Sequence, residues 1–277
     1  MLDRLKGAAR QKLQRAVADV VEAELAATRQ RLEDMHAEQM AKLQVLSDQV
    51  NGVDDDFGPL FDRLQDMEHR ARRDILYALD IDATADSAAF VREHMPKVPV
   101  FWHPHETLRF ALGEVEGAGL ALEFGVASGT TLKMIAAALS EDFRVVGFDT
   151  FEGLPEVWRT GFPAGEFAQE AIPEVPEAEL VAGLFEDTLP AFLAGCDDAV
   201  RFLHLDADLY SSTKTVLDLV GDRLQPGAVL VFDEFFNFPG WQHHEYLAWT
   251  EFVAQSGRSF EYLAYTGHNE QVVIRLT

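Results

Sequence analysis

From Gly119 onward the chain alternates short apolar runs with stretches of helical periodicity, and this alternation restricts the fold more than any other feature of the sequence. An apolar run of five or six residues is typical of a strand that is buried on both faces. Such strands separated by amphipathic helices predict βαβ units, and therefore an α/β fold with a mostly parallel sheet covered by helices on both faces. The six predicted strands are Leu120–Phe124, Val145–Phe148, Val200–Leu205, Ala228–Phe232, Phe260–Tyr265 and Gln271–Leu276.

The segments between these runs carry the expected helices and turns. The predicted helices are Thr130–Leu139, Ser211–Leu224 and Gln242–Gln255. The last two strands are separated only by Thr266–Asn269, which predicts a closing hairpin. Residues 155–178 are rich in proline and acidic residues, so we expect a loop over one edge of the sheet that becomes ordered on binding.

Residues 1–80 have a different texture, with apolar residues at helical spacing on an otherwise charged surface. The pattern predicts a long, coiled-coil-like helix that ends at Asn51–Asp56 and Gly58-Pro59, followed by more helix. Its stripe consists of Leu2, Leu5, Ala9, Leu13, Val17, Val20, Leu25, Leu32, Met35, Leu43, Leu46 and Val50. Such a stripe favours oligomerisation or docking, and packing on the chain's own domain is the alternative.

Three segments result from these patterns. We expect a helical arm over residues 1–80, a helical lead-in over 81–118 and the α/β domain over 119–277.

Charge and cysteine content exclude several classes of protein. The chain has 23 basic and 47 acidic residues, for a net charge of −24. Residues 1–80 hold 12 basic and 16 acidic residues, so 11 basic and 31 acidic residues remain in 81–277. Nucleic acids and anionic membranes both require a basic surface and are therefore not expected as partners. A single cysteine, a charged N-terminus and no apolar run long enough to span a membrane predict a cytoplasmic protein.

A glycine-containing turn follows the first predicted strand. Gly125 and Gly129 allow the backbone to approach a ligand, and Thr130 can cap the next helix. Ala127 replaces a glycine of the dinucleotide fingerprint, which disfavours a nicotinamide dehydrogenase. Asp149 ends the second strand 20 residues after Gly129, where an α/β sheet places an acid against ribose hydroxyls. Together with Glu123, these residues predict a nucleoside site.

Acidic residues cluster at two further strand ends, as Asp206 and Asp208 and as Asp233 and Glu234. The carboxyl ends of parallel strands open onto one crevice, so these carboxylates should face the nucleoside. Several carboxylates in one crevice repel each other unless a cation is bound, and oxygen ligands suit Mg²⁺ or Mn²⁺. The alternative is that Asp208 caps the next helix and Glu234 is solvated.

Five motifs in the same order resemble the macrocin O-methyltransferase (TylF-like) family of class I S-adenosylmethionine-dependent methyltransferases. They cover roughly residues 100–277 and are Glu123-Phe-Gly-Val-Ala-Ser-Gly129, Gly147-Phe-Asp-Thr-Phe-Glu-Gly-Leu-Pro155, Gly183-Leu-Phe-Glu-Asp-Thr-Leu-Pro190, Leu205-Asp-Ala-Asp-Leu-Tyr-Ser-Ser-Thr-Lys214 and Val231-Phe-Asp-Glu-Phe235. The resemblance implies a Rossmann-like, seven-stranded sheet, S-adenosylmethionine and a divalent metal, usually Mg²⁺.

The resemblance also implies roles for individual residues. Asp208 would be the general base, and Glu234 stands where many members of the family have aspartate. Asp206, Asp233 and Glu234 would hold the metal. The residues assigned to the cofactor are Glu123, Gly125, Ser128, Gly129, Thr130, Asp149, Phe185, Asp187 and Asp206. His243, in an aromatic segment after the metal acids, is an alternative base.

The predicted function is therefore methyl transfer from S-adenosylmethionine to a hydroxyl of a small acceptor, sugar-like by resemblance. A catechol-type phenol is an alternative acceptor, because a metal can chelate two adjacent hydroxyls. A non-catalytic oligomerisation protein with a methyltransferase-like domain is the alternative from another class. The N-terminal stripe predicts a homo-oligomer.

Overall fold

The computed structural model describes the backbone of residues 2–277 and the side chains of residues 10, 12, 14, 15, 17–48 and 57–277. The chain divides into two compact units, Met1–Asp74 and Ile75–Thr277. Among the described helices, none combines the length and the hydropathy that a membrane span requires.

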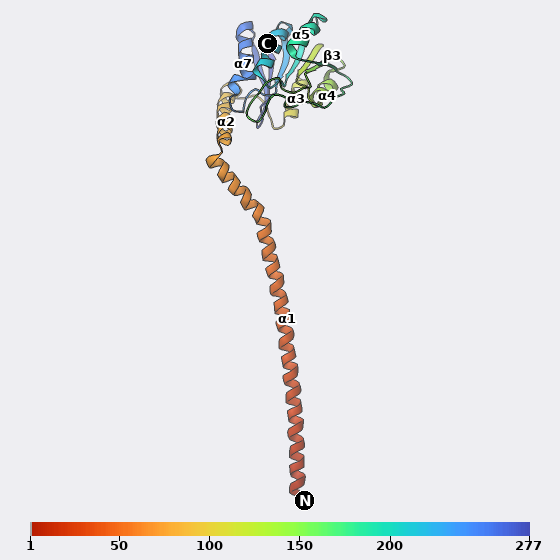
Figure 1. The fold of residues 1–277 in the computed structure, drawn as a ribbon, viewed down its shortest axis with the longest axis vertical. Helices are drawn as coiled ribbons and strands as arrows, with labels where there is room; N and C mark the ends of the chain where they lie inside the picture. Colours follow the sequence, from red (N-terminus) through yellow and green to blue (C-terminus); the bar gives the residue numbers. More distant parts are fainter. Residues whose placement is uncertain (1) are drawn as a thin grey trace. The chain divides into compact units, whose positions relative to one another are not determined.

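The first unit consists of one helix, α1 (Leu2–Arg73), which Figure 1 shows as an uninterrupted coil. The prediction of a long helix is confirmed, but the predicted end at Asn51–Asp56 and Gly58-Pro59 is wrong, because α1 continues through Pro59. A proline inside a helix removes one backbone hydrogen bond. A helix of 72 residues tolerates this loss because its other backbone hydrogen bonds remain. The side chains of Leu2, Leu5, Ala9, Leu13 and Val50, which belong to the predicted stripe, lie outside the described residues.

The second unit is built on an eight-stranded sheet with the order β1-β7-β8-β6-β5-β2-β3-β4. β8 runs antiparallel to both of its neighbours, and the other pairs are parallel. The strands are β1 (Val100–Phe101), β2 (Gly119–Phe124), β3 (Phe143–Asp149), β4 (Glu179–Ala182), β5 (Val200–Leu205), β6 (Leu224–Phe232), β7 (Phe260–Thr266) and β8 (Val272–Leu276). The predicted mostly parallel sheet and its closing hairpin are confirmed.

Two strands escaped the sequence analysis. β4 lies at one edge of the sheet and is only partly buried, so it lacks the apolar run of a central strand. β1 has two residues and lies at the opposite edge, within the segment predicted as a helical lead-in. With β1 and β4 the sheet has eight strands, one more than the seven that the family resemblance implied.

Helices cover both faces of the sheet, as predicted. Apolar residues of α2, α5, α6 and α7 share one core with Leu120, Leu122 and Phe124, whereas α3 and α4 share the other core with Ala121. The neighbouring side chains of β2 therefore point to opposite faces, and both faces are buried. The helices are α2 (Ile75–His94), α3 (Pro104–Gly113), α4 (Thr130–Leu139), α5 (Phe185–Ala194), α6 (Tyr210–Val220) and α7 (Glu245–Ser256), with the 3₁₀ helices η1 (Gly221–Arg223) and η2 (Trp241–His243).

The strand order reverses at β2, which pairs with β3 on one side and β5 on the other. In an open parallel sheet, a crevice forms beyond the carboxyl ends of the strands at such a point. Here Gly125 approaches the backbone of the β5 end so closely that an added Cβ would lie 1.7 Å from the Asp206 carbonyl oxygen. Its φ of +92° also favours glycine. Gly125 therefore allows the ends of β2 and β5 to meet at the crevice.

Candidate functional site

A cavity of about 660 Å³ lies at the carboxyl ends of the central strands. Gly125 follows β2, and Asp149 ends β3. Asp206 and Asp208 follow β5, and Asp233 and Glu234 follow β6. The hairpin between β7 and β8 adds Asn269, Glu270 and Gln271. The structure thus brings the two predicted acid clusters and Asp149 to one cavity.

Three carboxylates of this cavity converge closely. One oxygen from each of Asp206, Asp208 and Glu234 lies within 4.8 Å of the other two, and Asp206 also groups with Asp233 and His204 at that spacing. Asp208 and Glu234 are only 8% and 7% exposed. Glu234 Oε2 is buried with no hydrogen-bond partner among the described residues. Several buried carboxylate oxygens at this spacing, one of them unpartnered, fit the ligand set of a hard divalent cation.

Burial and mutual repulsion change the acidity of this cluster. Burial, followed by the charge of Asp233, raises the pKa of Asp206 and of Glu234 well above their ordinary values. The same two causes raise the pKa of Asp208 to about 7. These carboxyl groups hold protons more tightly than free carboxyls, because burial disfavours the charged form and the neighbouring negative charges oppose each other. A cation among them would favour their charged forms.

The backbone at Asp208 is held in an unusual conformation. Its φ is +58°, in the left-handed region that non-glycine residues seldom adopt. The Leu209 N–H donates to the Ala207 carbonyl across this residue, and α6 begins immediately afterwards at Tyr210. Backbone strain of this kind is commonly found at functional sites. The alternative interpretation of Asp208 as a helix cap is not supported, since no side-chain hydrogen bond caps α6.

Glu123 lies beneath the cavity and does not line it. It is fully buried, and its Oε1 lies 2.8 Å from His204 Nδ1, its register partner on β5. His204 Nε2 in turn lies 3.7 Å from Asp233 Oδ1. The assignment of Glu123 to the cofactor is therefore corrected: its side chain points between β2 and β5 into a buried pair with His204.

His204 is a site residue that the sequence analysis missed. Burial alone would lower the pKa of its imidazole, but the carboxylates of Asp233 and Glu123 outweigh burial and raise the pKa well above its ordinary value. For the Asp233 carboxyl the directions are reversed: burial alone would raise its pKa, but His204 and the amide of Gln271 outweigh burial and lower it. Asp233 is thus kept charged at neutral pH. A histidine inside an otherwise apolar strand, opposite a glutamate on the next strand, was the available signal.

Asp149 lines the cavity and also organises the turn beside it. Asp149 Oδ2 accepts hydrogen bonds from the backbone N–H groups of Val126 and Ala127, both at 2.8 Å. Its Oδ1 accepts one from Phe151 N–H at 2.7 Å. Three bonds leave one of the roughly four acceptor positions of a carboxylate for a ligand. Phe185, at the start of α5, lines the same cavity.

Besides Glu123, five predicted site residues do not line this cavity. Ser128 and Thr130 are exposed and their hydroxyls lie 2.9 Å apart, so these two side chains contact each other. An added Cβ on Gly129 would lie 3.1 Å from Val175, because segment 155–178 covers the turn. Asp187 points to solvent from the first turn of α5. His243 is exposed on η2, outside the residues that line the cavity, and its role as a base stays a prediction.

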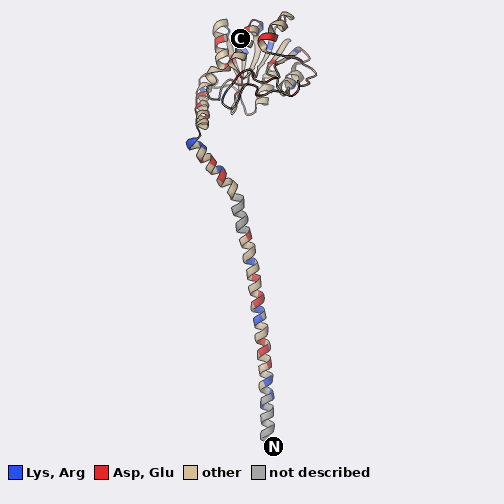
Figure 2. Cartoon of the chain, in the orientation of Figure 1, with Lys and Arg blue, Asp and Glu red and all other residues tan. Residues whose placement is uncertain are grey.

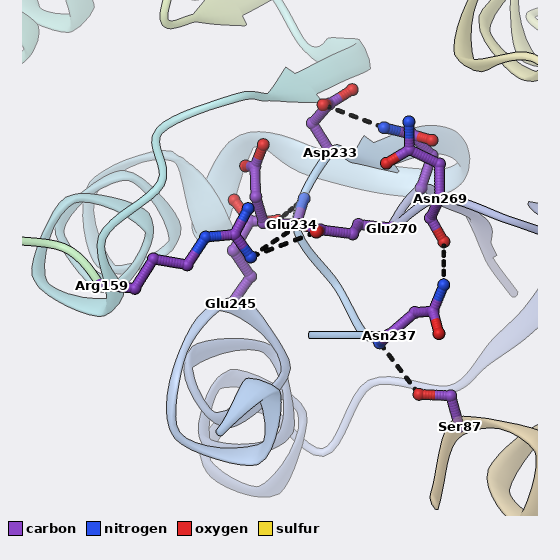
Figure 3. A network of polar contacts seen from close by, with 9 residues as sticks. Ser87, Arg159, Asp233, Glu234, Asn237, Glu245, Asn269 and Glu270 are labelled. Carbon is purple, nitrogen blue, oxygen red and sulfur yellow. Dashed lines mark hydrogen bonds and ion pairs between the residues drawn. The ribbon is translucent and has the colours of Figure 1, made fainter. Parts of the chain in front are cut away.

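Arg159 is the second residue that the sequence analysis missed. Its guanidinium lies over the rings of Trp158 and Phe238, 3.9 Å and 4.5 Å from their centroids. It donates to both carboxylate oxygens of Glu270, at 3.1 Å and 3.3 Å (Figure 3). Among the residues that line the cavity, Arg159 is the only lysine or arginine, against eight acidic residues. Segment 155–178 therefore supplies an ordered cation at the cavity, where the sequence predicted only a loop.

A second set of hydrogen bonds fixes the positions of Asp233 and Glu234, two of the predicted metal ligands (Figure 3). Glu245, at the start of α7, accepts the backbone N–H of Glu234 at 3.0 Å and the hydroxyl of Thr213 at 3.1 Å. Burial is the main cause that raises the pKa of Glu245 to about 8. Gln271 donates its amide to Asp233 Oδ2 at 3.0 Å. The position of each acid at the end of β6 is thus set by a residue from another element.

The comparison with known protein families bears on the central part of the chain. Residues 122–235 match the model of a methyltransferase-domain family, described as "Methyltransferase domain". A search of curated proteins found no match.

Three solved structures are similar to parts of this chain. The calicheamicin methyltransferase CalS11 is 26% identical, with 61% of this chain and 76% of that chain covered and a TM-score of 0.49. The O-methyltransferase NovP is 21% identical, with 62% and 78% covered and a TM-score of 0.45. TomG from Streptomyces achromogenes, an O-methyltransferase of tomaymycin synthesis solved with SAM, is 20% identical, with 70% and 89% covered and a TM-score of 0.42.

Proposed function

Starting from the methyltransferase domain over residues 122–235, we propose that this chain transfers the methyl group of S-adenosylmethionine to a hydroxyl of a small acceptor, with the help of a divalent metal. The observation that carries the proposal is the convergence of Asp206, Asp208 and Glu234 in the cavity that Asp149 also lines. Metal-assisted O-methylation requires a site for the methyl donor and a site for the metal. An acid placed to bind the ribose of the donor and a set of hard oxygen ligands for the metal lie in this one cavity.

Asp206 and Glu234 of this group would hold the metal together with Asp233, which groups with Asp206 and His204, and we expect the metal to be Mg²⁺ or Mn²⁺. When bound, such a metal lowers the pKa of a coordinated hydroxyl and orients it. His204 and Gln271 would keep Asp233 charged and correctly oriented for this task. Glu234 would be positioned through its backbone N–H bond to Glu245. Glu234 is longer than aspartate by one methylene group, and its unpartnered Oε2 is the atom available for a ligand.

Asp208 would accept the proton of the acceptor hydroxyl. Its carboxyl group lines the cavity, and its pKa of about 7 matches the optimum for a base that works near neutral pH. The methyl donor supplies a sulfonium leaving group, so no acid is needed for its departure. In-line positioning of the hydroxyl then supplies most of the remaining catalysis.

The charge of the cavity favours an uncharged or cationic acceptor over a phosphorylated one. Eight acidic residues line it, and the single arginine is already paired with Glu270. An acceptor phosphate would meet these carboxylates without an unpaired basic side chain among the lining residues. The motif resemblance suggests a sugar or a glycosylated natural product, and a catechol-type phenol is the alternative.

Calorimetric titration of S-adenosylmethionine, first with Mg²⁺ and then with EDTA, tests the cofactor and the metal separately. We expect micromolar binding in both conditions, because Asp149 and the glycine turn do not depend on the metal. Methyl transfer to a panel of sugars and catechols should then require Mg²⁺ or Mn²⁺. Full turnover in EDTA would refute the metal role. No binding of S-adenosylmethionine by the folded protein would support the non-catalytic alternative.

A further inference from the structure

Helix α1 presents large apolar side chains to solvent along much of its length. In the described part of α1, Leu43 is 59% exposed, Leu60 50%, Leu64 52% and Met67 66%. Other exposed apolar residues of α1 are Val17, Val20, Val21, Leu25, Leu32, Met35, Met40, Val45, Leu46, Phe57 and Phe61. An apolar stripe of this length on an otherwise polar helix indicates a partner surface, since a helix that remains solvated on all sides is polar all round.

The second half of α1 carries a strict heptad repeat. With Leu43 as position a, successive a and d positions fall on apolar residues without exception as far as Ala71. They are Leu43, Leu46, Val50, Val53, Phe57, Leu60, Leu64, Met67 and Ala71, and we refer to this set as the seam. The alternating spacing of three and four residues over four heptads is the pattern of a coiled coil. The repeat is displaced relative to Leu32 and Met35, which lie eleven and eight residues before Leu43.

The residues that suggested a helix end lie outside this seam. Gly58 occupies position b and Pro59 position c, which face away from the partner in a coiled coil. An added Cβ on Gly58 would contact nothing within 4 Å. The proline therefore interrupts the outer face of α1 and leaves the spacing of Phe57, Leu60 and Leu64 intact. This arrangement explains why a Gly-Pro pair coexists with an unbroken repeat.

We propose that a second copy of the chain covers the seam, in a parallel, in-register coiled coil. A repeat with apolar residues at every a and d position is complementary to itself, because in a parallel pair each layer brings together identical residues. The charges beside the seam agree with this pairing. Arg63 at position g would face Glu68 at position e of the second copy, and these residues have opposite charges.

The flanking charges leave the seam accessible. Lys42 pairs with Glu38, and Arg72 pairs with Glu68, each at a spacing of four residues along α1. Along the described part of α1, basic and acidic residues follow one another in short groups (Figure 2). Among the charged residues beside the seam, Arg63 and Glu68 are the ones that would pair between two parallel copies. Exposed pairs of this kind contribute little to stability, so Glu68 can accept Arg63 of the second copy as well.

The mass of the full chain in solution provides the first test. Light scattering should give twice the chain mass of 30.9 kDa. The double variant Leu60→Asp/Leu64→Asp should shift the protein to a single-chain mass at micromolar concentration, because four aspartates would be buried in adjacent layers. The control is Gln65→Asp/His69→Asp, which adds the same charges at positions b and f and should remain dimeric. A monomeric wild type, or a seam variant that stays dimeric, would overturn the proposal.

Cysteine cross-linking tests the orientation and register. The chain has one cysteine, Cys196, which is first replaced by serine. In that background, Leu64→Cys should form a disulfide-linked dimer under mild oxidation, because equivalent a positions face each other only in a parallel, in-register pair. Asp62→Cys, at position f, should not cross-link. Dimers without a Leu64→Cys cross-link would exclude the parallel register. The methyl-transfer assay is a separate readout, so this proposal can fail without affecting the proposed function.

Discussion

At the scale of single residues, the cavity is defined by the environment of each carboxyl group. Asp208 and Asp233 lie in the same cavity, yet the pKa of one is raised and that of the other is lowered. The difference arises because Asp233 has His204 and Gln271 as neighbours, whereas Asp208 has burial and negative charges as its two largest influences. Such a separation of pKa values is a common sign that two acids have different roles. We assign proton transfer to Asp208 and metal binding to Asp233.

Asp208→Asn tests the first of these roles. The amide cannot accept a proton, so we expect the rate of methyl transfer to fall by roughly 10²–10⁴-fold, with S-adenosylmethionine affinity unchanged by calorimetry. In the wild type, the rate should fall as the pH decreases through about 7, because the base becomes protonated. A bound cation would move this transition to lower pH. The variant should lose the transition.

The control for this variant is Asp222→Asn, an exposed acid on η1. It should keep both the rate and its pH dependence. A rate for Asp208→Asn within threefold of the wild type would assign the base to another residue.

His204→Gln tests the support of Asp233. Glutamine keeps a polar side chain but cannot carry the positive charge that lies between Glu123 and Asp233. Loss of a residue that orients a metal ligand typically lowers metal affinity by about 10–100-fold. We expect this decrease for Mn²⁺, measured by electron paramagnetic resonance without acceptor. Thermal denaturation of the variant separates this effect from unfolding. Unchanged Mn²⁺ affinity in a folded variant would contradict the proposed support.

At the scale of elements, the close approach of β2 and β5 is the decisive contact. Gly125 has a positive φ, but so do several other glycines, and conformation alone does not distinguish it. The distinguishing feature is the carbonyl of Asp206, which occupies the space of a Cβ. The functional meaning of this glycine therefore depends on a strand that is 75 or more residues away in sequence.

Gly125→Ala and Gly117→Ala separate these two effects. Both glycines have φ near +90°, but an added Cβ on Gly117 contacts nothing within 4 Å. Gly117→Ala should cost about 1–2 kcal/mol of unfolding free energy, from backbone strain alone. Gly125→Ala should cost more and should also weaken S-adenosylmethionine binding, because the ends of β2 and β5 must separate. Equal losses in urea denaturation would show that the close approach is unimportant.

At the scale of the whole molecule, the chain consists of two units with different sources of stability. Residues 75–277 enclose two apolar cores around the sheet, one of which includes Ala83 and Phe90 of α2. The other unit consists of helix α1 (Leu2–Arg73), whose described part has an exposed apolar face. The second unit, residues 75–277, is stable by burial within one chain, whereas the first unit, helix α1, needs a partner for its apolar face.

Residues 75–277 expressed alone should therefore fold and bind S-adenosylmethionine with an affinity within threefold of the full chain. Their mass by light scattering should correspond to one copy, because the seam is absent. Circular dichroism and calorimetry measure the two properties independently. An unfolded fragment would show that α1 is required for the fold of the second unit, contrary to its separate cores.

Local pattern and strand order were sufficient to predict much of this molecule. The apolar runs identified six strands because a strand buried on both faces must be apolar throughout, and the strands in turn brought Asp149, Asp206 and Asp233 to one edge of the sheet. Edge strands β1 and β4 were missed because a strand with only one neighbour is partly exposed and need not be apolar throughout. The helix end predicted at Gly58-Pro59 was wrong because the prediction considered only the helix-breaking residues. It did not take into account the heptad repeat, which continues on both sides of them.

The sequence by itself determined the fold class, the residue types at the site and the apolar repeat of α1, since each depends on residues that are near in sequence or on the rule that parallel strands end at one edge. Only the tertiary structure decided which side chains meet. It paired Glu123 with His204 across two strands, brought Arg159 to Glu270 and left His243 in solvent. These contacts depend on strand register and loop path, which are set by packing between segments far apart in sequence and leave no mark in local periodicity.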